Sequence, residues 1–539
     1  MELNRQSLKE KSFWLDRGYE LPQFNLEEVI SETKENPEWI HFGAGNIFRA
    51  FQANLMQKLL NKGLVKTGLV AVDGFDYEII SKQYHPHDNL SVLVTLKADG
   101  KVEKTVIASI ANTAILDFSN KVEIENLKRM FSKDSLKMAS FTITEKGYSL
   151  VNGDGHYIPN VLADFKQHPF QARSYIGKVT ALLFTRYQAN QKPIAMVSMD
   201  NCAHNGDKLY KAVHTFAKEW VSNHIVEEGF LAYIEDNSKV SFPWTMIDKI
   251  TPRPDASVEK ILKEDGLNLA PVITSKGSYV APFVNAEETE YLVIEDRFPN
   301  GKLPLEQVGV VYTNRETVEK VEQMKVCTCL NPLHTALAVY GCLLGFHKIS
   351  DEVKDGDLLE LIKRIGYVEG LPVVVHPGVL DPKEFIDTVI DIRLPNVFMP
   401  DTPQRIATDT SQKLAIRFGQ TIKTYLSQGK DTSLLFGISL VIAGWLRYLL
   451  ARDDEGNPME LSDDPLLKIM QEKLSVLNKD NVSSVLEPIL KDQSLFGVDL
   501  VKAGLSNRII SYFIDMQEKG HVRSVLHKTM EELRNEINC

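Results

Sequence analysis

Residues 39–51 read WIHFGAGNIFRAF, and this stretch decides the class of fold. WIHF has the composition of a strand, and the run that begins at Ile47 has the apolar spacing of a helix. Between them, Gly43 and Gly45 occupy the first two positions of the pattern GxGxxG. The first glycine permits a tight turn, and the second lets the backbone approach a pyrophosphate at the helix N-terminus. Phe48 stands where the third glycine belongs, so the turn fits either a dinucleotide site or an ordinary strand–helix connection.

The next strand-like segment ends in an acidic residue. GLVAVD ends in Asp73, which lies 28 residues beyond Gly45. A carboxylate at this strand end would bind the ribose hydroxyls of NAD and repel the 2′-phosphate of NADP. Because Gly74 and Phe75 follow, Asp73 also fits a plain turn residue at the end of a strand, and both interpretations stay open.

Strand and helix patterns alternate through the first half of the chain. Six segments have the β-branched composition of strands: WIHF, GLVAVD, MASFTIT, IAMVSMD, APFVNAEETEYLVIED and VGVVYT. Helical spacing separates several of them, which predicts an α/β fold with a parallel sheet and crossover helices. The strand patterns end at about residue 312, and helical patterns follow. We therefore expect a Rossmann-type, nucleotide-binding domain at residues 1–305 and a mostly α-helical C-terminal domain at residues 306–539.

The bulk composition limits the kinds of partner. A chain of 539 residues is too long for one core, so two domains are the default. A net charge of −11 argues against nucleic acid as the main partner and favours a soluble, cytoplasmic protein with a small-molecule substrate. The longest apolar stretch, residues 434–446, is shorter than the ~20 residues that cross a bilayer, so we expect a buried helix and no membrane partner. Five cysteines without a repeated spacing are typical of a reduced, intracellular chain, and the oligomeric state stays open.

Residues 324–334 read MKVCTCLNPLH and contain three residues that could bind a metal ion. Cys327, Cys329 and His334 would be the ligands, with both cysteines on one face of a strand. Zinc sites normally combine CxxC spacing with a second ligand cluster, and the sequence contains neither. Buried cysteines commonly serve as small apolar residues, so we expect no metal.

The same stretch also fits a lysine-based site. Asn331 is a good helix N-cap and Pro332 is favoured in the first turn, which places His334 near the positive end of a helix. Lys325 would end the preceding helix, so that Lys325, Asn331 and His334 meet at one junction. A buried lysine can exchange protons and an amide can stabilise an alkoxide. The residues alone also fit a capped helix with a surface lysine, and this interpretation stays open.

Six segments in order along the chain share the pattern of one family. They are FGAGNIFRAFQ, TITEKGY (142–148), SMDNCAHNG (198–206), MIDKITP (246–252), EQMKVCTCLNPLH and DTPQRIATDTSQK (401–413). Together they resemble the motifs of the polyol-specific long-chain dehydrogenases, the mannitol dehydrogenase family. The family patterns are GxGxFHRAHQ for the glycine turn, SCDNxxxNG, ExxK…NxxH and DxxxRIAxDGSxK.

The resemblance implies an NAD-dependent, metal-independent secondary-alcohol dehydrogenase. By position it makes Lys325 the catalytic acid/base, Asn201 and Asn331 the oxyanion-stabilising amides, and His334 the residue that orients the substrate. The substrate-binding positions that it implies are Arg405, Lys413, Asp248 and Glu322. The cofactor-binding positions are Gly43, Gly45, Asn46, Ile47 and Asp73.

Departures from the family pattern leave the substrate open. Five residues separate Lys325 from Asn331 where the common members have four, so we expect either a local bulge or a displaced lysine. The usual NGxH is NPLH, and the glycine turn differs at Asn46, Ile47 and Phe48. The resemblance favours reduction of D-fructuronate to D-mannonate with NADH, with tagaturonate to altronate and fructose to mannitol as alternatives. A non-catalytic dinucleotide or sugar-acid sensor and a metal-dependent hydrolase remain alternatives from other classes.

Overall fold

The computed structural model describes residues 1–254 and 256–537, and the chain divides into two compact units. Unit 1 comprises Met1–Lys97 and Lys101–Glu319, and unit 2 comprises Ala98–Gly100 and the chain from Lys320 onward. This division lies later than the predicted boundary after residue 305, because strand β15 (Val311–Thr313) still pairs with β14 (Tyr291–Glu295) of unit 1. As a boundary between separately folding domains, the predicted position stays a proposal.

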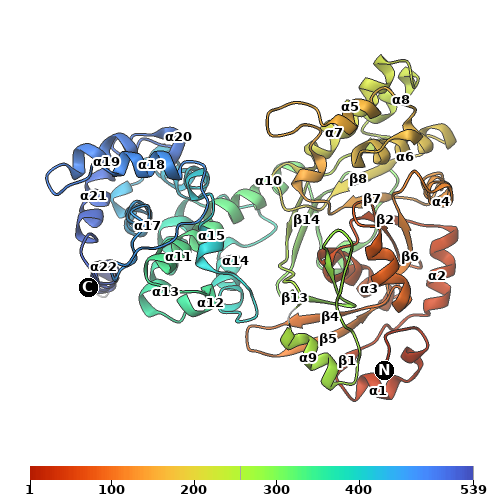
Figure 1. Ribbon diagram of the computed structural model, residues 1–539, viewed down its shortest axis with the longest axis horizontal. Helices are drawn as coiled ribbons and strands as arrows, with labels where there is room; N and C mark the ends of the chain where they lie inside the picture. The colour runs from red at the N-terminus through yellow and green to blue at the C-terminus, as the bar shows by residue number, and fades with distance from the viewer. Residues whose placement is uncertain (255, 538–539) are drawn as a thin grey trace. The chain divides into compact units, whose positions relative to one another are not determined.

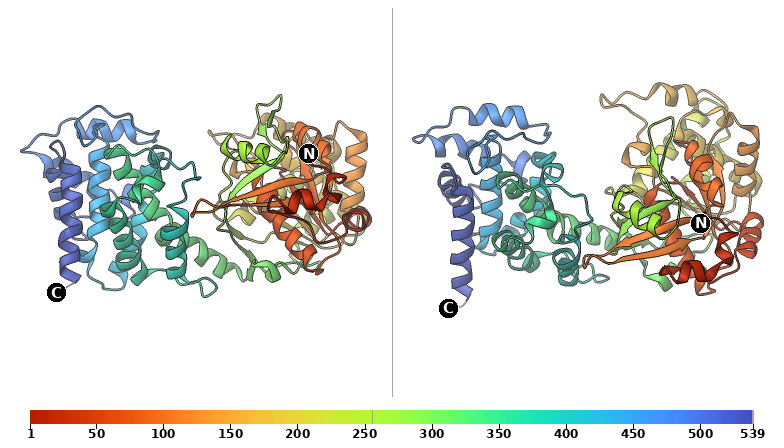
Figure 2. Two further views of the ribbon diagram at one scale, coloured as in Figure 1. Left: turned by 90° about the horizontal axis from the view of Figure 1, so that it is seen from below. Right: turned by 60° about the horizontal axis from the view of Figure 1, so that its bottom comes forward.

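The centre of unit 1 is a six-stranded parallel sheet (Figure 1, Figure 2). Its strands are β2 Trp39–Phe42, β3 Leu69–Asp73, β6 Ile110–Ile115, β7 Met138–Phe141, β8 Ile194–Ser198 and β9 Val240–Ser241. They lie in the order β6-β3-β2-β7-β8-β9, and every neighbouring pair is parallel. This is the strand order of the Rossmann fold, which confirms the predicted class and puts the reversal of order between β2 and β7.

Both faces of this sheet are buried, which explains why its strands are apolar at almost every position. Successive side chains of β2 alternate between two cores. Ile40 and Phe42 join the core on one face, and Trp39 joins the core on the other. The flanking helices are α3 Ala53–Asn61 on the Trp39 side, and α4 Lys121–Phe131, α6 Tyr175–Ala189 and α7 Asn205–Ser222 on the other.

Unit 1 contains further strands, of which the sequence patterns predicted only those within residues 281–296 and 308–313. β1 (Tyr19–Glu20), β4 (Ser91–Leu96), β5 (Val102–Ile107) and β13 (Phe283–Glu287) form a second sheet; β10 (Thr245–Asp248), β14 and β15 form a third; β11 (Val272–Ile273) pairs with β12 (Tyr279–Val280). Residues 281–296, predicted as one strand, divide into β13 and β14 because residues 288–290 leave the extended pairing. The remaining helices of unit 1 are α1 Lys11–Leu15, α2 Leu26–Glu35, α5 Pro159–Asp164, α8 Glu228–Glu235 and α9 Ala256–Glu264.

Unit 2 is helical, and the described residues after Glu319 contain no strand. Its helices include α10 Arg315–Met324, which crosses the boundary, α11 Asn331–Leu343, α12 Ile349–Glu352, α13 Gly356–Lys363, α14 Pro382–Thr388, α15 Pro403–Ala407, α16 Gln420–Ser427 and α17 Phe436–Tyr448. Five more follow: α18 Leu467–Leu474, α19 Val482–Leu490, α20 Gln493–Phe496, α21 Ser506–Asp515 and α22 His521–Ile537. Two π-helical segments matter for the site, η8 Lys325–Cys329 and η13 Ala415–Gly419.

One continuous helical stretch is long and apolar enough to cross a membrane. It runs over residues 315–343, and 78% of its most apolar window is buried inside the protein. Burial of this kind is typical of a core helix in a globular protein. The shorter apolar helix α17 is also buried almost throughout, as its sequence predicted.

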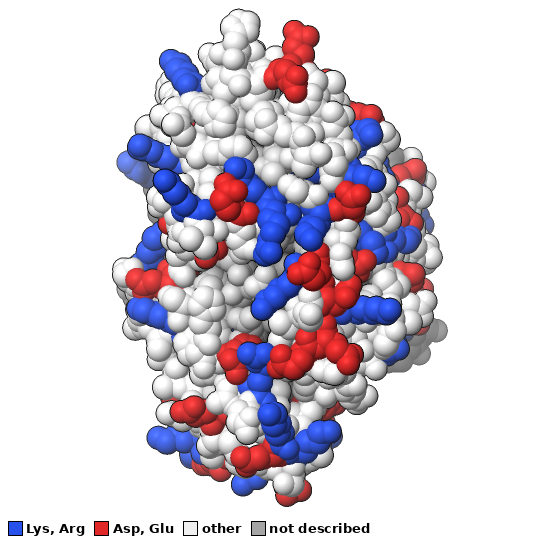
Figure 3. All heavy atoms as spheres, turned by 90° about the vertical axis from the view of Figure 1, so that its right-hand side faces the viewer, with Lys and Arg blue, Asp and Glu red and all other residues white. Residues whose placement is uncertain are grey.

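Charges of both signs are mixed on the face drawn in Figure 3. Lysine and arginine side chains lie among aspartates and glutamates there, instead of in a separate field. Because neighbouring opposite charges cancel beyond a Debye length of about 10 Å, this face presents no broad positive surface of the kind that binds a phosphate backbone.

Candidate active site

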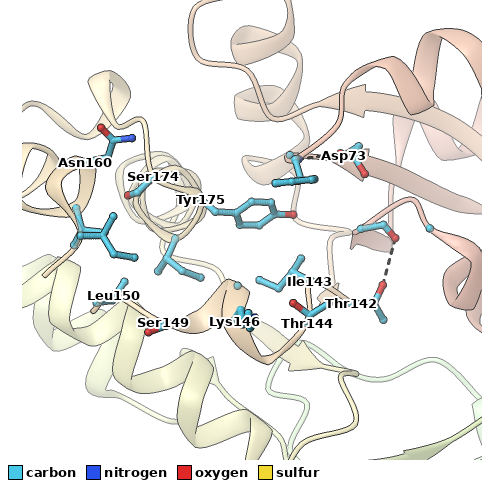
Figure 4. Close-up of a pocket in the computed structure, with 18 of the residues that line it drawn as sticks. Asp73, Thr142, Ile143, Thr144, Lys146, Ser149, Leu150, Asn160, Ser174 and Tyr175 are labelled. Atoms are coloured by element: carbon cyan, nitrogen blue, oxygen red, sulfur yellow. Dashed lines mark hydrogen bonds between the residues drawn. The ribbon is translucent and has the colours of Figure 1, made fainter. Parts of the chain in front are cut away.

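A cavity of about 570 Å³ lies in unit 1 at the point where the strand order reverses. Its lining comes from the glycine turn after β2, the end of β3, the loop after β7 and the start of α6, as Figure 4 shows. The lining residues include Gly43, Gly45, Asp73, Thr142, Lys146 and Tyr175. Open α/β sheets bind ligands at this position, outside the carboxyl ends of the strands.

The glycine turn needs its first glycine. Gly43 has φ +110°, and a Cβ atom there would lie 2.2 Å from the carbonyl oxygen of Thr142. Its N–H donates to the carbonyl of Val72 at 2.9 Å, which ties the turn to β3. A Cβ on Gly45 would meet nothing within 4 Å, so the backbone faces open space there. Gly43 is therefore needed for the tight turn, as the pattern predicts, and the approach of a pyrophosphate at Gly45 stays a prediction.

Phe48 stands at the position of the third glycine and packs against the strand in a different way. That glycine normally lets the helix pack closely on the strand. In this chain Phe48 is fully buried and stacks on His41 of β2, with ring centroids 4.3 Å apart and planes 6° apart. The helix also opens there into a π-helical segment, Phe48–Gln52. A flat aromatic contact and a wider helical turn replace the close glycine contact.

A buried chain of hydrogen bonds supports the turn from below. Trp39 Nε1 donates to Ser140 Oγ at 2.6 Å, and Ser140 Oγ lies 2.6 Å from His41 Nδ1. His41 Nε2 lies 2.8 Å from Thr142 Oγ1, which donates to the carbonyl of Gly43. The directions agree if neutral His41 carries its proton on Nε2. Burial lowers the pKa of His41 to about 3, so this neutral form persists at neutral pH.

Asp73 holds its own loop and the glycine turn together. One carboxylate oxygen accepts from the N–H groups of Phe75 and Asp76 at 2.9 and 2.7 Å, and the other accepts from the N–H of Ala44 at 3.3 Å. Burial raises the pKa of Asp73, although these three bonds oppose the shift. The turn role is therefore present, and the same carboxylate lines the cavity where a ribose would lie.

Tyr175 is a functional candidate that the sequence did not suggest. Its ring extends from the start of α6 toward the end of β3 (Figure 4), and it packs over Gly74, where a Cβ would lie 2.5 Å from the ring. Tyr175 is one of the residues that line the cavity, and its buried hydroxyl has no hydrogen-bond partner among the described residues. Buried hydroxyls are normally paired, so Tyr175 is a candidate for a contact with a polar ligand group.

A second network joins two of the motifs. Asp200, after β8, accepts from the N–H groups of Ile143 and Thr144 at 3.0 and 2.9 Å and from the hydroxyl of Tyr148 at 2.5 Å. Tyr148 also lies 2.8 Å from Ser198 Oγ. Asp200 therefore positions the loop after β7 that lines the cavity. Both residues stand inside the motifs TITEKGY and SMDNCAHNG, which was the available signal.

Asn201 and Asp248 both lie at the carboxyl ends of strands in unit 1. Asn201 is exposed in the bend after β8, and Asp248 is the last residue of β10 and is buried. Asn205 connects the two places, since its amide donates to the carbonyls of Asp200 and Thr245, each at 3.0 Å. Asn46 and Ile47 begin the helix after the glycine turn but do not line the cavity; Asn46 Oδ1 instead accepts from Arg49.

In unit 2, Lys325, Asn331 and His334 lie on one nearly continuous helix. Lys325 is 3% exposed and begins η8, and the N–H of Leu330 donates to the Lys325 carbonyl at 3.1 Å across five residues. Such a π turn accommodates one residue more than an α turn. The expected bulge is therefore present, and Lys325 does not end its helix as predicted. Glu322 lies in the preceding turn, in α10.

The predicted helix cap is wrong by one residue. Leu330 is the N-cap of α11, Asn331 is its first residue, and the side chain of neither makes a capping bond. His334 is in the first turn, as expected, and its Nε2 lies 3.7 Å from a carboxylate oxygen of Asp401. The other Asp401 oxygen accepts from Arg405. Asp401 thus joins two of the predicted site residues.

Lys413 and the cysteines are engaged in local contacts. Lys413 Nζ donates to the carbonyls of Thr408 and Ile406 at the end of α15. Cys327 and Cys329 lie in a π-helical segment and not in a strand, and burial raises the pKa of both thiols, that of Cys327 to about 11. The described residues contain no group of three or more histidines, cysteines and carboxylates that could hold a metal ion. The roles assigned to all these residues stay predictions.

Comparison with known proteins identifies the family. The mannitol dehydrogenase Rossmann domain matches residues 37–307, and the mannitol dehydrogenase C-terminal domain matches residues 317–515. The chain is 48% identical to the D-mannonate oxidoreductase of Thermotoga maritima over 540 residues, with 99% of each chain covered. A solved D-sorbitol dehydrogenase in substrate-free form has a TM-score of 0.79 at 25% identity, covering 97% of this chain and 100% of that one. Mannitol 2-dehydrogenase of Pseudomonas fluorescens, solved with NAD and D-mannitol, has a TM-score of 0.68 at 24% identity, covering 99% and 100% of the two chains, which shows a shared fold. These matches confirm the resemblance found in the motifs: the chain belongs to the mannitol dehydrogenase family of oxidoreductases.

Proposed function

We propose that this chain catalyses the NADH-dependent reduction of D-fructuronate to D-mannonate in the cytoplasm, and the reverse oxidation. The observation that supports it most is the 48% identity to a D-mannonate oxidoreductase over 99% of both chains. Identity to the solved sorbitol and mannitol dehydrogenases is about half as high, at 25% and 24%. We assign cofactor binding to residues 1–305 and substrate binding mainly to residues 306–539.

The cavity in unit 1 suits a nicotinamide dinucleotide. Gly43 and Gly45 let the backbone approach the pyrophosphate, Asp73 accepts from ribose hydroxyls, and the unpaired hydroxyl of Tyr175 supplies a further polar contact. The carboxylate of Asp73 also disfavours the 2′-phosphate of NADP by like-charge repulsion. When bound, NADH supplies the hydride that reduces the ketone carbon.

The residues of unit 2 transfer the proton to and from the substrate oxygen. Lys325, buried at the start of its π turn, donates a proton to the ketone oxygen, and in the reverse direction it accepts the hydroxyl proton. Asn331, six residues further along the chain at the start of α11, stabilises the charge that develops on that oxygen. His334, held beside Asp401, orients a substrate hydroxyl. Asn201, Asp248 and Glu322 keep the oxyanion-stabilising and substrate-binding roles that the family motifs imply.

The test is NADH oxidation by the purified chain, followed by absorbance, with D-fructuronate, D-tagaturonate and D-fructose offered separately. We expect the highest kcat/KM with D-fructuronate and a lower one with NADPH than with NADH. Preference for tagaturonate would change the substrate but keep the sugar-acid class. Turnover of fructose alone would contradict that class, and no turnover with any ketose and either cofactor would favour the sensor hypothesis.

A further inference from the structure

Arg417 is a cation beside the Lys325 helix that lies outside the family motifs. It belongs to η13, which packs against η8, the segment that begins with Lys325. Its Nη1 donates to Thr335 Oγ1, and Thr335 Oγ1 donates in turn to the carbonyl of Asn331 at 2.9 Å. Arg417 is therefore anchored to the first turn of α11, the turn that supplies the proposed oxyanion amide.

Among the described residues, no carboxylate forms an ion pair with this guanidinium. Within the part of the chain that the structure describes, Arg417 forms no ion pair, and the hydroxyl of Thr335 is its hydrogen-bond partner. The side chain of Arg417 is only partly buried, so part of it reaches the surface of unit 2. Burial lowers the pKa of Arg417 to about 10, which still leaves the group charged at neutral pH. A half-buried charge without a counter-ion is costly, and an anionic ligand would offset that cost.

The two cations that the family motif predicts are already occupied. Arg405 is paired with Asp401, which also faces His334. Lys413 donates to two backbone carbonyls at the end of α15. Lys413 keeps its charge, but its Nζ is directed at these carbonyls. Arg417 differs from both residues, because its guanidinium has neither a carboxylate nor a backbone carbonyl as a partner among the described residues.

We propose that Arg417 binds the carboxylate of the sugar-acid substrate and selects such substrates over neutral ketoses. The inference rests on the proposed function. An arginine fork matches a carboxylate in a bidentate geometry, which a hydroxymethyl group cannot reproduce. A carboxylate at Arg417 places the rest of a linear substrate beside the first turn of α11, where Asn331 and His334 lie.

The test compares two substrates that differ only at this group. D-Fructose carries a hydroxymethyl group where D-fructuronate carries the carboxylate, and both have the same ketone. For Arg417→Gln we expect kcat/KM with fructuronate to fall about 10- to 100-fold, mainly through KM, because one charge-assisted hydrogen-bond pair is lost. The kcat/KM with fructose should stay at the wild-type value. Arg417→Lys, which keeps the charge without the fork, should recover part of the loss.

Controls separate this role from folding and from the proposed function. Arg417→Gln should keep the wild-type melting temperature and NADH affinity, and Lys430→Gln, at an exposed lysine of the same unit, should change neither substrate preference nor KM. An equal loss with both substrates, or no loss with fructuronate, would overturn the role of Arg417 while leaving the reaction intact. If the wild-type enzyme turns over no uronate and D-mannonate does not raise its melting temperature, the proposed function fails and the inference fails with it.

Discussion

Lys325 lies almost completely inside unit 2, although lysine is one of the residue types that are rarely buried. We predict that Lys325→Met lowers kcat for ketose reduction by about 10²- to 10⁴-fold, the usual contribution of a general acid. NADH affinity should stay within a factor of about two, because the proposed cofactor cavity belongs to unit 1. Steady-state kinetics and NADH fluorescence titration measure the two effects, with exposed Lys354→Met as the control. Wild-type turnover in Lys325→Met would remove the lysine from the mechanism.

Tyr175 gives a prediction with opposite signs for stability and affinity. Its buried hydroxyl has no partner among the described residues, so Tyr175→Phe should raise the melting temperature of the cofactor-free protein. The same change should weaken NADH binding about 2- to 10-fold, as expected for one lost hydrogen bond. Thermal unfolding without ligand and calorimetric titration with NADH check the two parts. Unchanged NADH affinity would mean that the hydroxyl does not touch the cofactor.

Glu352 gives a prediction about pH. Its carboxyl group is fully buried against Gly341, both oxygens have no partner among the described residues, and burial raises the pKa to about 9. Since the folded pKa exceeds the usual value of 4.5, the folded state holds a proton that the unfolded state releases. Stability is thus fully present below about pH 4.5 and is lost as pH rises toward 9, by about 1.4 kcal/mol per pH unit.

Glu352→Gln should therefore gain stability relative to wild type as pH rises. The melting temperatures of the two proteins, measured between pH 5 and pH 8.5, should separate progressively in favour of the variant. Glu384→Gln, at an exposed position, serves as the matched control and should follow the wild-type curve. A constant difference between Glu352→Gln and wild type across this range would show that Glu352 is ionised in the folded protein.

At the scale of elements, the π turn after Lys325 can be tested by deleting its extra residue. It contains the extra residue between Lys325 and Asn331, and its five-residue hydrogen bond connects α10 to α11, interrupted only at Leu330. Deleting Val326 should convert the π turn to an α turn while leaving both flanking helices in place. We predict a folded enzyme with kcat within about tenfold of wild type, by circular dichroism and steady-state kinetics.

Deleting Gln323 is the matched control, because it removes one residue from an ordinary α turn. The preceding part of α10 would rotate by about 100°, which turns Val318 and Val321 out of the core. This variant should lose stability strongly. If both deletions are equally damaging, the π turn is an essential part of the site geometry and not an accommodated insertion.

Local sequence predicted some of these elements correctly and failed at the π turn. Strand, turn and helix at residues 39–61 follow from local composition, and each is present. Asn331 was predicted as a cap because Asn–Pro commonly opens a helix, but the π turn places the break at Leu330 and makes Asn331 the first residue of α11. The sequence could not single out three further site candidates, Tyr175, Asp200 and Arg417. Each is a candidate because of the hydrogen-bond partners that it has or lacks, and those partners are far away in the sequence.

At the scale of the whole molecule, the sequence predicted a Rossmann-type first part and a helical second part. This was possible because buried strands and helices differ in the spacing of their apolar residues. The antiparallel pair β4–β5 was not predicted, since it lies inside the connection between β3 and β6, where a crossover helix is the usual expectation. The division into units also follows pairing between distant strands more than local composition. β15 belongs to unit 1 because of its partner β14, although helical patterns already begin beside it.

Two compact units, one of which contains the proposed cofactor cavity, predict how ligands affect unfolding. Calorimetry of the full chain should resolve two transitions. NADH at about 100 times its dissociation constant stabilises the state that binds it by about 2.7 kcal/mol, so one transition should rise by a few degrees. The transition of unit 2 should stay in place until D-mannonate is added. If NADH instead moves a single cooperative transition, the two units unfold together, and the Gly43→Ala variant, which blocks the glycine turn, should abolish that shift.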